Sequence, residues 1–325
     1  MIYNKIQLDE KKPYVTLTSY ILDENNEIGL EEKRPAVLIC PGGGYMMCSY
    51  QEGEPVAMRF ASMGYHAFVL HYSVYCEGKI FAPDAGEEMP PKKDSEYPAA
   101  LRDIGRAMLT IRRHADDWNV DPDRVALCGF SAGAHNAALY GTSWDRPVLT
   151  DFFGVSPETL KPAAVILGYT LSDYVYEEEK LKDPSVSEMA RSVSLNSNLA
   201  LFGCEEPSEE QLRGASPALL VKENTPPHFL WATSEDEQVP VQHSLRMAEA
   251  LADHHVLFEL HIFEKGRHGL SLANRAAAIS KPMLNPDAAK WPELAESWLE
   301  KRFSIDLPDE TDYGRMMRNR RNYGE

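Results

Sequence analysis

Short apolar runs alternate with segments of helical spacing along most of this chain. The runs "RPAVLIC", "YHAFVLHYSV", "RVALC", "AAVILGY", "HFLWATS" and "VLFELHIF" have the length and the β-branched and aromatic content of buried strands. Between and after them, "EPVAMRFASMG", "YPAALRDIGRAMLTIRRHADDW" and "WPELAESWLEKRF" carry apolar residues at the spacing of amphipathic helices. Repeated alternation of strand and helix predicts an α/β fold with a mostly parallel central sheet and helices on both faces.

Three polar segments interrupt this alternation. Residues 76–96 are rich in Pro and Gly, whereas 141–160 and 171–216 are long and have no strand signal. In compact folds, segments of this kind often serve as lids or caps. We therefore predict one domain over residues 1–325 with a small cap built from these insertions. We also expect "YVTLTSYIL" to form an edge hairpin, and residues 304–325 to be a weakly ordered tail.

Composition narrows the class of protein. The 325 residues are 43% hydrophobic, enough for a large core, and the net charge of −17 disfavours nucleic acid and anionic membranes as partners. No apolar stretch approaches the ~20 residues of a membrane span, and the N-terminus lacks the pattern of a signal peptide. Five scattered cysteines without CxxC spacing predict reduced thiols in a cytoplasmic protein, with no disulfide framework or zinc site.

A serine lies between two glycines where the run "RVALC" passes into the helix-like "AHNAALYG". In "GFSAG" a strand turns abruptly into a helix, and such a bend holds a serine in a strained conformation with its hydroxyl above the sheet. Gly129 and Gly133 are needed there because a Cβ at either position would collide with neighbouring backbone. The motif in this context predicts that Ser131 is a nucleophile, placed near the positive end of the following helix.

A serine nucleophile needs a base, and the base needs a carboxylate that orients it. Of the ten histidines we expect His268 to be the base, because it follows the last strand run between Gly266 and Gly269. Sites of open parallel sheets lie at this carboxyl edge of the strands. Asp236, in the loop after "HFLWATS", is the predicted acid, and Asp173, after "AAVILGY", is the alternative.

The loop "CPGGGYMMCSY" predicts an anion site. Acyl transfer passes through a tetrahedral oxyanion that preorganised N–H donors stabilise. We expect the donors to be the amides of Gly43, Gly44 and Ala132, the last because it follows the nucleophile. The loop does not fit a phosphate cradle, since no GK[ST] follows it. The bulky neighbours Tyr45 and Met46 are the predicted substrate-binding residues, which together with Met47 would restrict the acyl side. The alternative is that these side chains belong to the core.

The order of glycine-rich loop, GxSxG motif, acid and histidine resembles the α/β-hydrolase fold. "CPGGGYMMCSYQEGEPVAMRFASMGYHAFVLHYSV" together with "RVALCGFSAGAHNAALYG" is similar to the acetyl esterase/lipase group that includes acetylxylan-esterase-like carboxylesterases, a resemblance that covers residues 35–303. One departure is Pro41, because members of the hormone-sensitive-lipase branch begin this loop with a histidine that organises it. The resemblance implies hydrolysis of small acyl esters by a Ser-His-Asp mechanism, without a metal ion or organic cofactor.

The resemblance also implies a substrate class. An acetyl group on a polar small molecule, such as an acetylated xylo-oligosaccharide, fits a cytoplasmic enzyme of this group. A broad carboxylesterase or lipase is an alternative, as is a serine peptidase of the prolyl-oligopeptidase type, although 325 residues leave no room for the propeller domain of such peptidases. A non-catalytic binding protein of the same fold is disfavoured by the presence of Ser131, Asp236 and His268.

Overall fold

The computed structural model describes residues 1–23, 33–79, 89–305 and 312–322, which form an α/β structure around one sheet. The eight strands within these residues follow the order β1-β2-β4-β3-β5-β6-β7-β8. β3 to β8 are parallel, whereas β2 pairs antiparallel with both β1 and β4. The strands are β1 (Ile2–Gln7), β2 (Thr16–Ile21), β3 (Arg34–Cys40), β4 (His66–His71), β5 (Val120–Phe130), β6 (Ala164–Gly168), β7 (His228–Thr233) and β8 (Phe258–Phe263). The predicted fold class is confirmed.

Helices cover both faces of the sheet. Residues of α2, α3 and α8 belong to one hydrophobic cluster, and residues of α1 and α9 belong to a second cluster on the opposite face. The helices are α1 (Glu54–Ser62), α2 (Ala99–Arg113), α3 (Ala132–Gly141), α4 (Pro147–Phe153), α5 (Tyr174–Leu181), α6 (Glu188–Phe202), α7 (Glu209–Gly214), α8 (Gln242–Asp253), α9 (Trp291–Glu300) and α10 (Asp312–Asn322). Single 3₁₀ turns are η1 (Tyr50–Glu52), η2 (Pro157–Thr159), η3 (Pro217–Leu219), η4 (Lys281–Met283) and η5 (Ala288–Lys290).

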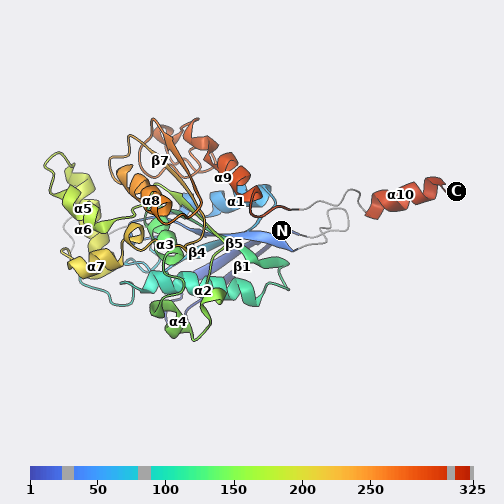
Figure 1. The fold of residues 1–325 in the computed structure, drawn as a ribbon, viewed down its shortest axis with the longest axis horizontal. Coiled ribbons are helices and arrows are strands. Elements are labelled where there is room, and N and C mark those ends of the chain that lie inside the picture. Colours follow the sequence, from blue (N-terminus) through green and yellow to red (C-terminus); the bar gives the residue numbers. More distant parts are fainter. Residues whose placement is uncertain (24–32, 80–88, 306–311, 323–325) are drawn as a thin grey trace.

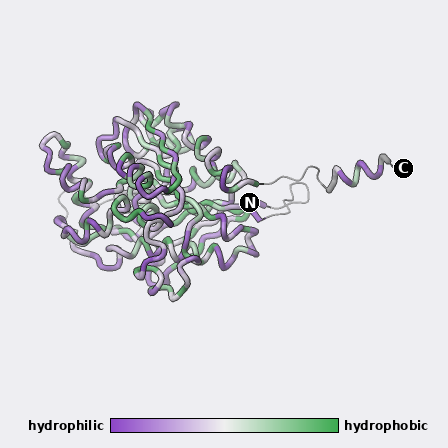
Figure 2. Tube along the Cα trace, in the orientation of Figure 1, coloured by the Kyte–Doolittle hydropathy of each residue, from purple (hydrophilic) through white to green (hydrophobic). Residues whose placement is uncertain are grey.

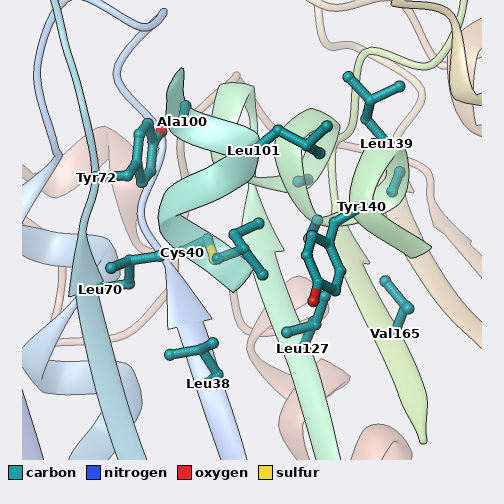
Figure 3. Close-up of a cluster of buried hydrophobic side chains, with 14 of the residues drawn as sticks. Leu38, Cys40, Leu70, Tyr72, Ala100, Leu101, Leu127, Leu139, Tyr140 and Val165 are labelled. Atoms are coloured by element: carbon teal, nitrogen blue, oxygen red, sulfur yellow. The ribbon is translucent and has the colours of Figure 1, made fainter. Parts of the chain in front are cut away.

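The continuous apolar runs fill both clusters because neighbouring side chains of a strand point to opposite faces. In β3, Leu38 belongs to the first cluster, and the adjacent Val37 and Ile39 belong to the second. Figure 3 shows Leu38 beside Leu127 of β5, beneath the helices of the first face. Figure 2, coloured by hydropathy, shows hydrophobic residues gathered toward the middle of the body and many hydrophilic residues around it.

The N-terminal hairpin differs from the prediction in one respect. "YVTLTSYIL" contains β2, which lies between β1 and β4 and has all six of its residues buried, so the edge strand is β1. Most residues of β1 are exposed, as is typical of a strand at the edge of a sheet. The alternating pattern therefore identified a strand, but its position in the sheet depends on a partner that precedes it in the chain.

The polar insertions lie in different places. Residues 171–216 form α5, α6 and α7, which sit together at one side of the molecule (Figure 1). Residues 141–160 contain α4, which packs on α2: Arg102 Nε donates to the Val148 carbonyl, and its guanidinium lies over the ring of Phe152. Of the other predicted segments, 80–88 within 76–96, and 306–311 and 323–325 within the tail, lie outside the described residues, and α10 occupies the rest of the tail end.

Within the described part of the chain, no helix combines the length and the apolar content that crossing a membrane requires.

Candidate active site

The carboxyl ends of the six neighbouring parallel strands, β3 to β8, lie at one edge of the sheet, as parallel topology requires. β5 ends at the bend that carries Ser131, which has φ 51° and ψ −122°, outside the regions that non-glycine residues prefer. The bend brings strand and helix so close that a Cβ at Gly129 would lie 2.3 Å from the Gly133 carbonyl oxygen. A Cβ at Gly133 would lie 2.1 Å from the Cys40 carbonyl oxygen, on the neighbouring strand β3.

This crowding leads to a prediction about folding. Gly133→Ala is expected to destabilise the protein by about 3 kcal/mol or more, because the added methyl group meets backbone of β3, which cannot rotate away. Thermal or urea unfolding measures the change. Gly214→Ala is the matched control: the space around Gly214, at the end of α7, is open, so alanine should leave stability equal or slightly higher. Equal stability of the two variants would contradict the prediction.

Three predicted residues form one hydrogen-bonded chain. The Ser131 hydroxyl lies 2.8 Å from Nε2 of His268, and Nδ1 of His268 lies 2.7 Å from Oδ2 of Asp236. Since the carboxylate can only accept, Nδ1 carries the proton that it donates to Asp236, and Nε2 is left to accept from the serine. The arrangement has the geometry of a serine nucleophile with an oriented base.

The loop after β7 holds Asp236 in a fixed orientation. Its side chain is 1% exposed, and Oδ1 accepts from the amides of Gln238 and Val239 at 3.0 and 2.9 Å. The alternative acid, Asp173, lies elsewhere. It caps α5 by accepting from the Tyr176 amide at 3.0 Å and pairs with Arg246 at 3.1 Å. The structure thus brings Asp236, and not Asp173, to His268.

The predicted oxyanion donors surround Ser131. Within the described part of the chain, no protein acceptor pairs with the amides of Gly43, Gly44 or Ala132. Gly43 and Gly44 have φ of 123° and 61°, which glycine adopts without strain. Ala132 opens α3, where amides have no partner within the helix. Three unpaired N–H groups close to a nucleophile can stabilise a developing oxyanion.

The two predicted substrate-binding residues have different positions. Met46 lines a cavity beside Ser131, as does Met47. Tyr45 does not line it: its side chain is 1% exposed, lies in the core, and donates its hydroxyl proton to Nδ1 of His135. His135 in turn donates from Nε2 to the Ala215 carbonyl at 2.7 Å, and burial lowers its pKa to about 4, so the ring is neutral. For Tyr45 the structure thus has the core alternative, with the tyrosine at a positive φ of 59°.

Two cavities of unequal size meet at Ser131. The smaller, of about 40 Å³, is lined by residues that include Ala132, His135, Leu171 and Tyr174. The larger, of about 260 Å³, is lined by residues that include Met46, Met47, Ser49, Asn196 and His268. Residues that line both are Gly44, Ser131, Val193 and Gln238.

Sequence reasoning missed the residues that wall these cavities from α6. Val193, Ser194, Ser197 and Asn198 line the smaller cavity, and Val193 and Asn196 line the larger. The segment was predicted to belong to a cap, but no pattern in it indicated which side chains would reach Ser131. Sequence reasoning also did not predict the burial of Glu52, although this residue closely follows the glycine-rich loop. A carboxylate in a polar loop usually faces solvent, so nothing in the sequence marked this one as buried.

Fold and site together define an α/β hydrolase. A family model described as BD-FAE matches residues 88–251, half of the 325-residue chain, and the chain therefore belongs to the BD-FAE family. Among curated proteins it is similar to the endo-1,4-β-xylanase B of Butyrivibrio fibrisolvens, 34% identical over 247 residues that make up 74% of this chain and 33% of that protein. The chain spans between 33% and 48% of the length of the curated relatives it matches.

Solved structures cover the chain more completely. The carboxylesterase Cest-2923 from Lactobacillus plantarum is 29% identical with a TM-score of 0.73, over 95% of this chain and 100% of that chain. The acetyl ester-xyloside bifunctional hydrolase from Caldicellulosiruptor lactoaceticus is 30% identical with a TM-score of 0.69, over 93% and 97%. The chain thus has the fold and the family of carboxylic ester hydrolases and is similar to acetylxylan-esterase-like members of that class.

Proposed function

We propose that this protein is a serine esterase that removes acetyl groups from carbohydrates, such as acetylated xylo-oligosaccharides. The observation that carries the proposal is the hydrogen-bonded chain from Ser131 through His268 to Asp236, set where two unequal cavities meet. A cytoplasmic location is part of the proposal, supported by the five free cysteines.

The position of His268 supports a proposed assignment of the two cavities to the two halves of an ester. In the first half of the reaction the histidine must give its proton to the departing alcohol oxygen, so the alcohol lies on the side of His268. His268 lines the larger cavity and does not line the smaller one, which is lined instead by residues that include Ala132 and Leu171. The proposal therefore puts the alcohol in the larger cavity and the acyl chain in the smaller. Met46 lines the larger cavity, so it would contact the alcohol and not, as expected from the sequence, the acyl group.

The steps follow from these positions. The Ser131 oxygen attacks the ester carbonyl carbon while its proton passes to Nε2 of His268, and the resulting oxyanion accepts from the amides of Gly43, Gly44 and Ala132. The tetrahedral intermediate collapses, the alcohol leaves with the proton from His268, and the acetyl group remains on the serine. A water molecule then gives a proton to His268 and attacks the acyl-enzyme, which releases acetate and returns the proton to Ser131.

Cavity sizes support the acetyl preference. A group the size of a water molecule needs roughly 10–15 Å³ of cavity volume, so the smaller cavity, of about 40 Å³, holds about three such groups. The larger cavity offers polar side chains, Ser49, Asn196 and Gln238, to the hydroxyl groups of a sugar. A relative of known structure is named as acting on acetyl esters and xylosides, which adds support for this substrate class.

An acyl-chain series with one common leaving group tests the assignment. We expect kcat/KM to be highest for acetyl, lower for butyryl and very low for octanoyl esters, because the small cavity is full after a few carbon atoms. In an open apolar groove each added methylene would instead contribute about 0.8 kcal/mol. Efficiency that rises steadily to octanoyl would overturn the acetyl assignment and favour a lipase.

The alcohol side is tested with acetylated xylo-oligosaccharides. Released acetate should exceed that from an unactivated alkyl acetate under the same conditions, because only the sugar has hydroxyl groups for the larger cavity. An amide analogue of the best ester serves as the control for the peptidase alternative, and we expect no appreciable cleavage. Cleavage of the amide at a rate near that of the ester would favour a peptidase.

A further inference from the structure

A buried carboxylate that plays no part in the steps above lies beside the glycine-rich loop, at the wall of the larger cavity. Glu52, in η1, is 2% exposed as a residue, and both of its carboxylate oxygens have partners. The Tyr169 hydroxyl donates to Oε1 at 2.6 Å, and the Gly42 amide donates to Oε2 at 2.8 Å. Burial raises the pKa of Glu52, and these two hydrogen bonds act against the rise. A buried carboxylate is costly, so its placement calls for a physical reason.

One end of this contact is the loop that carries the oxyanion donors. Glu52 holds the amide of Gly42, and the Gly42 carbonyl accepts from the Ser49 amide at 2.8 Å. The carbonyl of Gly42 and the N–H of Gly43 belong to the same planar peptide, so fixing one directs the other. The next peptide is fixed in the same way, because the Gly43 carbonyl accepts from the Met46 amide at 3.0 Å, which directs the N–H of the following glycine.

Gly42 packs closely against both Glu52 and the nucleophile. A Cβ added at Gly42 would lie 2.8 Å from Oε2 of Glu52 and 2.9 Å from the Ser131 Cβ, so only a glycine fits at this place. Glu52 therefore supports the loop from a position at the wall of the larger cavity, which it lines together with Gly43 and Gly44. This loop lacks the histidine that organises it in members of the hormone-sensitive-lipase branch, because Pro41 stands at that position.

The other end of the contact is the loop that carries the base. The Tyr169 hydroxyl, while donating to Glu52, accepts from the Ser271 amide at 2.9 Å, and the Tyr169 ring lies edge-on to the ring of His268 with centroids 5.0 Å apart. The neighbour of Glu52, Gln51, donates to the Gly269 carbonyl at 2.9 Å, and its own carbonyl accepts from the Ser271 hydroxyl at 2.6 Å. η1 is thus joined to both sides of the reaction centre.

We propose that Glu52 is a positioning residue: its carboxylate fixes the glycine-rich loop in the orientation that aims the amides of Gly43 and Gly44 at the oxyanion, and joins this loop to the one that carries His268. The proposal rests on the proposed esterase function. Glu52 touches no reacting atom, and its effect on the rate passes through the backbone of the loop.

The variant Glu52→Gln tests this role. Glutamine has one acceptor oxygen and an NH₂ group, so it cannot accept from both Gly42 and Tyr169. Either the Gly42 amide faces the NH₂ group, or the Tyr169 hydroxyl loses its acceptor and must turn to accept from the NH₂ group, and both outcomes break the present link. We expect kcat to fall by about 10- to 100-fold, as for a displaced oxyanion donor, with little change in KM. The preference for an acetate ester over the matching thionoester should fall by a similar factor, because sulfur is a poor acceptor and gains little from an oxyanion hole.

Asp103→Asn is the matched control. Asp103 is another buried carboxylate, 0% exposed, that accepts from a backbone amide, that of Ser73 at 2.7 Å, and it lines neither cavity at Ser131. Its replacement should lower Tm and leave the ester-to-thionoester preference at the wild-type value. A Glu52→Gln variant that lowers Tm but keeps the wild-type preference would give Glu52 the same purely structural role and overturn the proposal.

Two further measurements keep the test decisive. If Glu52→Gln does not fold, Tyr169→Phe removes one donor to Glu52 and should lower kcat several-fold at unchanged KM, whereas wild-type kcat would overturn the proposal. The rate at which a fluorophosphonate modifies Ser131 depends on the oxyanion donors but on no particular ester, and it should fall in Glu52→Gln. A failed assay with sugar acetates therefore counts against the proposed substrate, while an unchanged phosphonylation rate counts against the role of Glu52.

Discussion

Ser131→Ala is expected to lower kcat for acetyl esters by about 10⁵- to 10⁶-fold, the largest effect of any single substitution in this protein. The change removes the oxygen that forms the acyl-enzyme, and the remaining rate comes from binding and from the unpaired amides around the site. The fold should be preserved, because alanine at φ 51° carries the same backbone strain as serine and the lost hydrogen bond to His268 is the substituted side chain's main contact.

Steady-state kinetics and fluorophosphonate labelling check this expectation together. The wild type should be labelled on a peptide that contains Ser131, and the alanine variant should not be labelled there. Circular dichroism and Tm of the two proteins serve as the folding control. If the variant lost only about tenfold in kcat, which corresponds to roughly 1.4 kcal/mol of activation free energy, another nucleophile would have to carry the reaction.

His268→Ala should be nearly as severe as Ser131→Ala, and Asp236→Asn should cost about 10⁴-fold in kcat. Without the imidazole the serine keeps its proton. With asparagine at 236, an amide group can face Nδ1, so the imidazole takes the tautomer that presents a proton to Ser131 instead of accepting one. Since the three residues act as a unit, the double variant of Ser131 and His268 should be no slower than either single variant.

Asp173→Asn is the matched control for the acid. Asp173 is nearly as buried as Asp236, with side chains 5% and 1% exposed, and it also accepts from a backbone amide, but its ion partner is Arg246. We expect asparagine there to affect Tm and to change kcat little. A larger loss of kcat from Asp173→Asn than from Asp236→Asn would transfer the role of acid to Asp173.

The sequence was sufficient for the fold and for the placement of the reacting groups. Each of Ser131, Asp236 and His268 directly follows an apolar run, and parallel strands carry their carboxyl ends to one edge, so chain order translated into proximity in space. The hydrogen bonds between these side chains agree with that prediction in geometry, and their catalytic roles remain predictions until the variants are measured.

What the sequence could not supply was the surroundings of the site. The inward turn of Tyr45 depends on a positive φ at a residue type that rarely adopts one, and the burial of Glu52 depends on contacts with Tyr169, more than a hundred residues away. The position of residues 141–160 could not be predicted either. The polar composition suggested a cap segment, but it does not indicate which face a segment covers, and α4 in this segment packs on α2.

The side chains with which α6 lines the two cavities have a consequence for how substrate selectivity can change. α6 supplies side chains to both cavities but none to the hydrogen-bonded set of Ser131, His268 and Asp236. The residues of α6 that shape the cavities are therefore separate in the sequence from the residues that react. Under the proposed assignment of the cavities, we expect substitutions at Ser194 or Ser197 to change selectivity for the acyl group and those at Asn196 to change selectivity for the alcohol, whereas Val193 lines both cavities. Selectivity could then be altered by substitutions in one helix while Ser131, His268 and Asp236 stay in place.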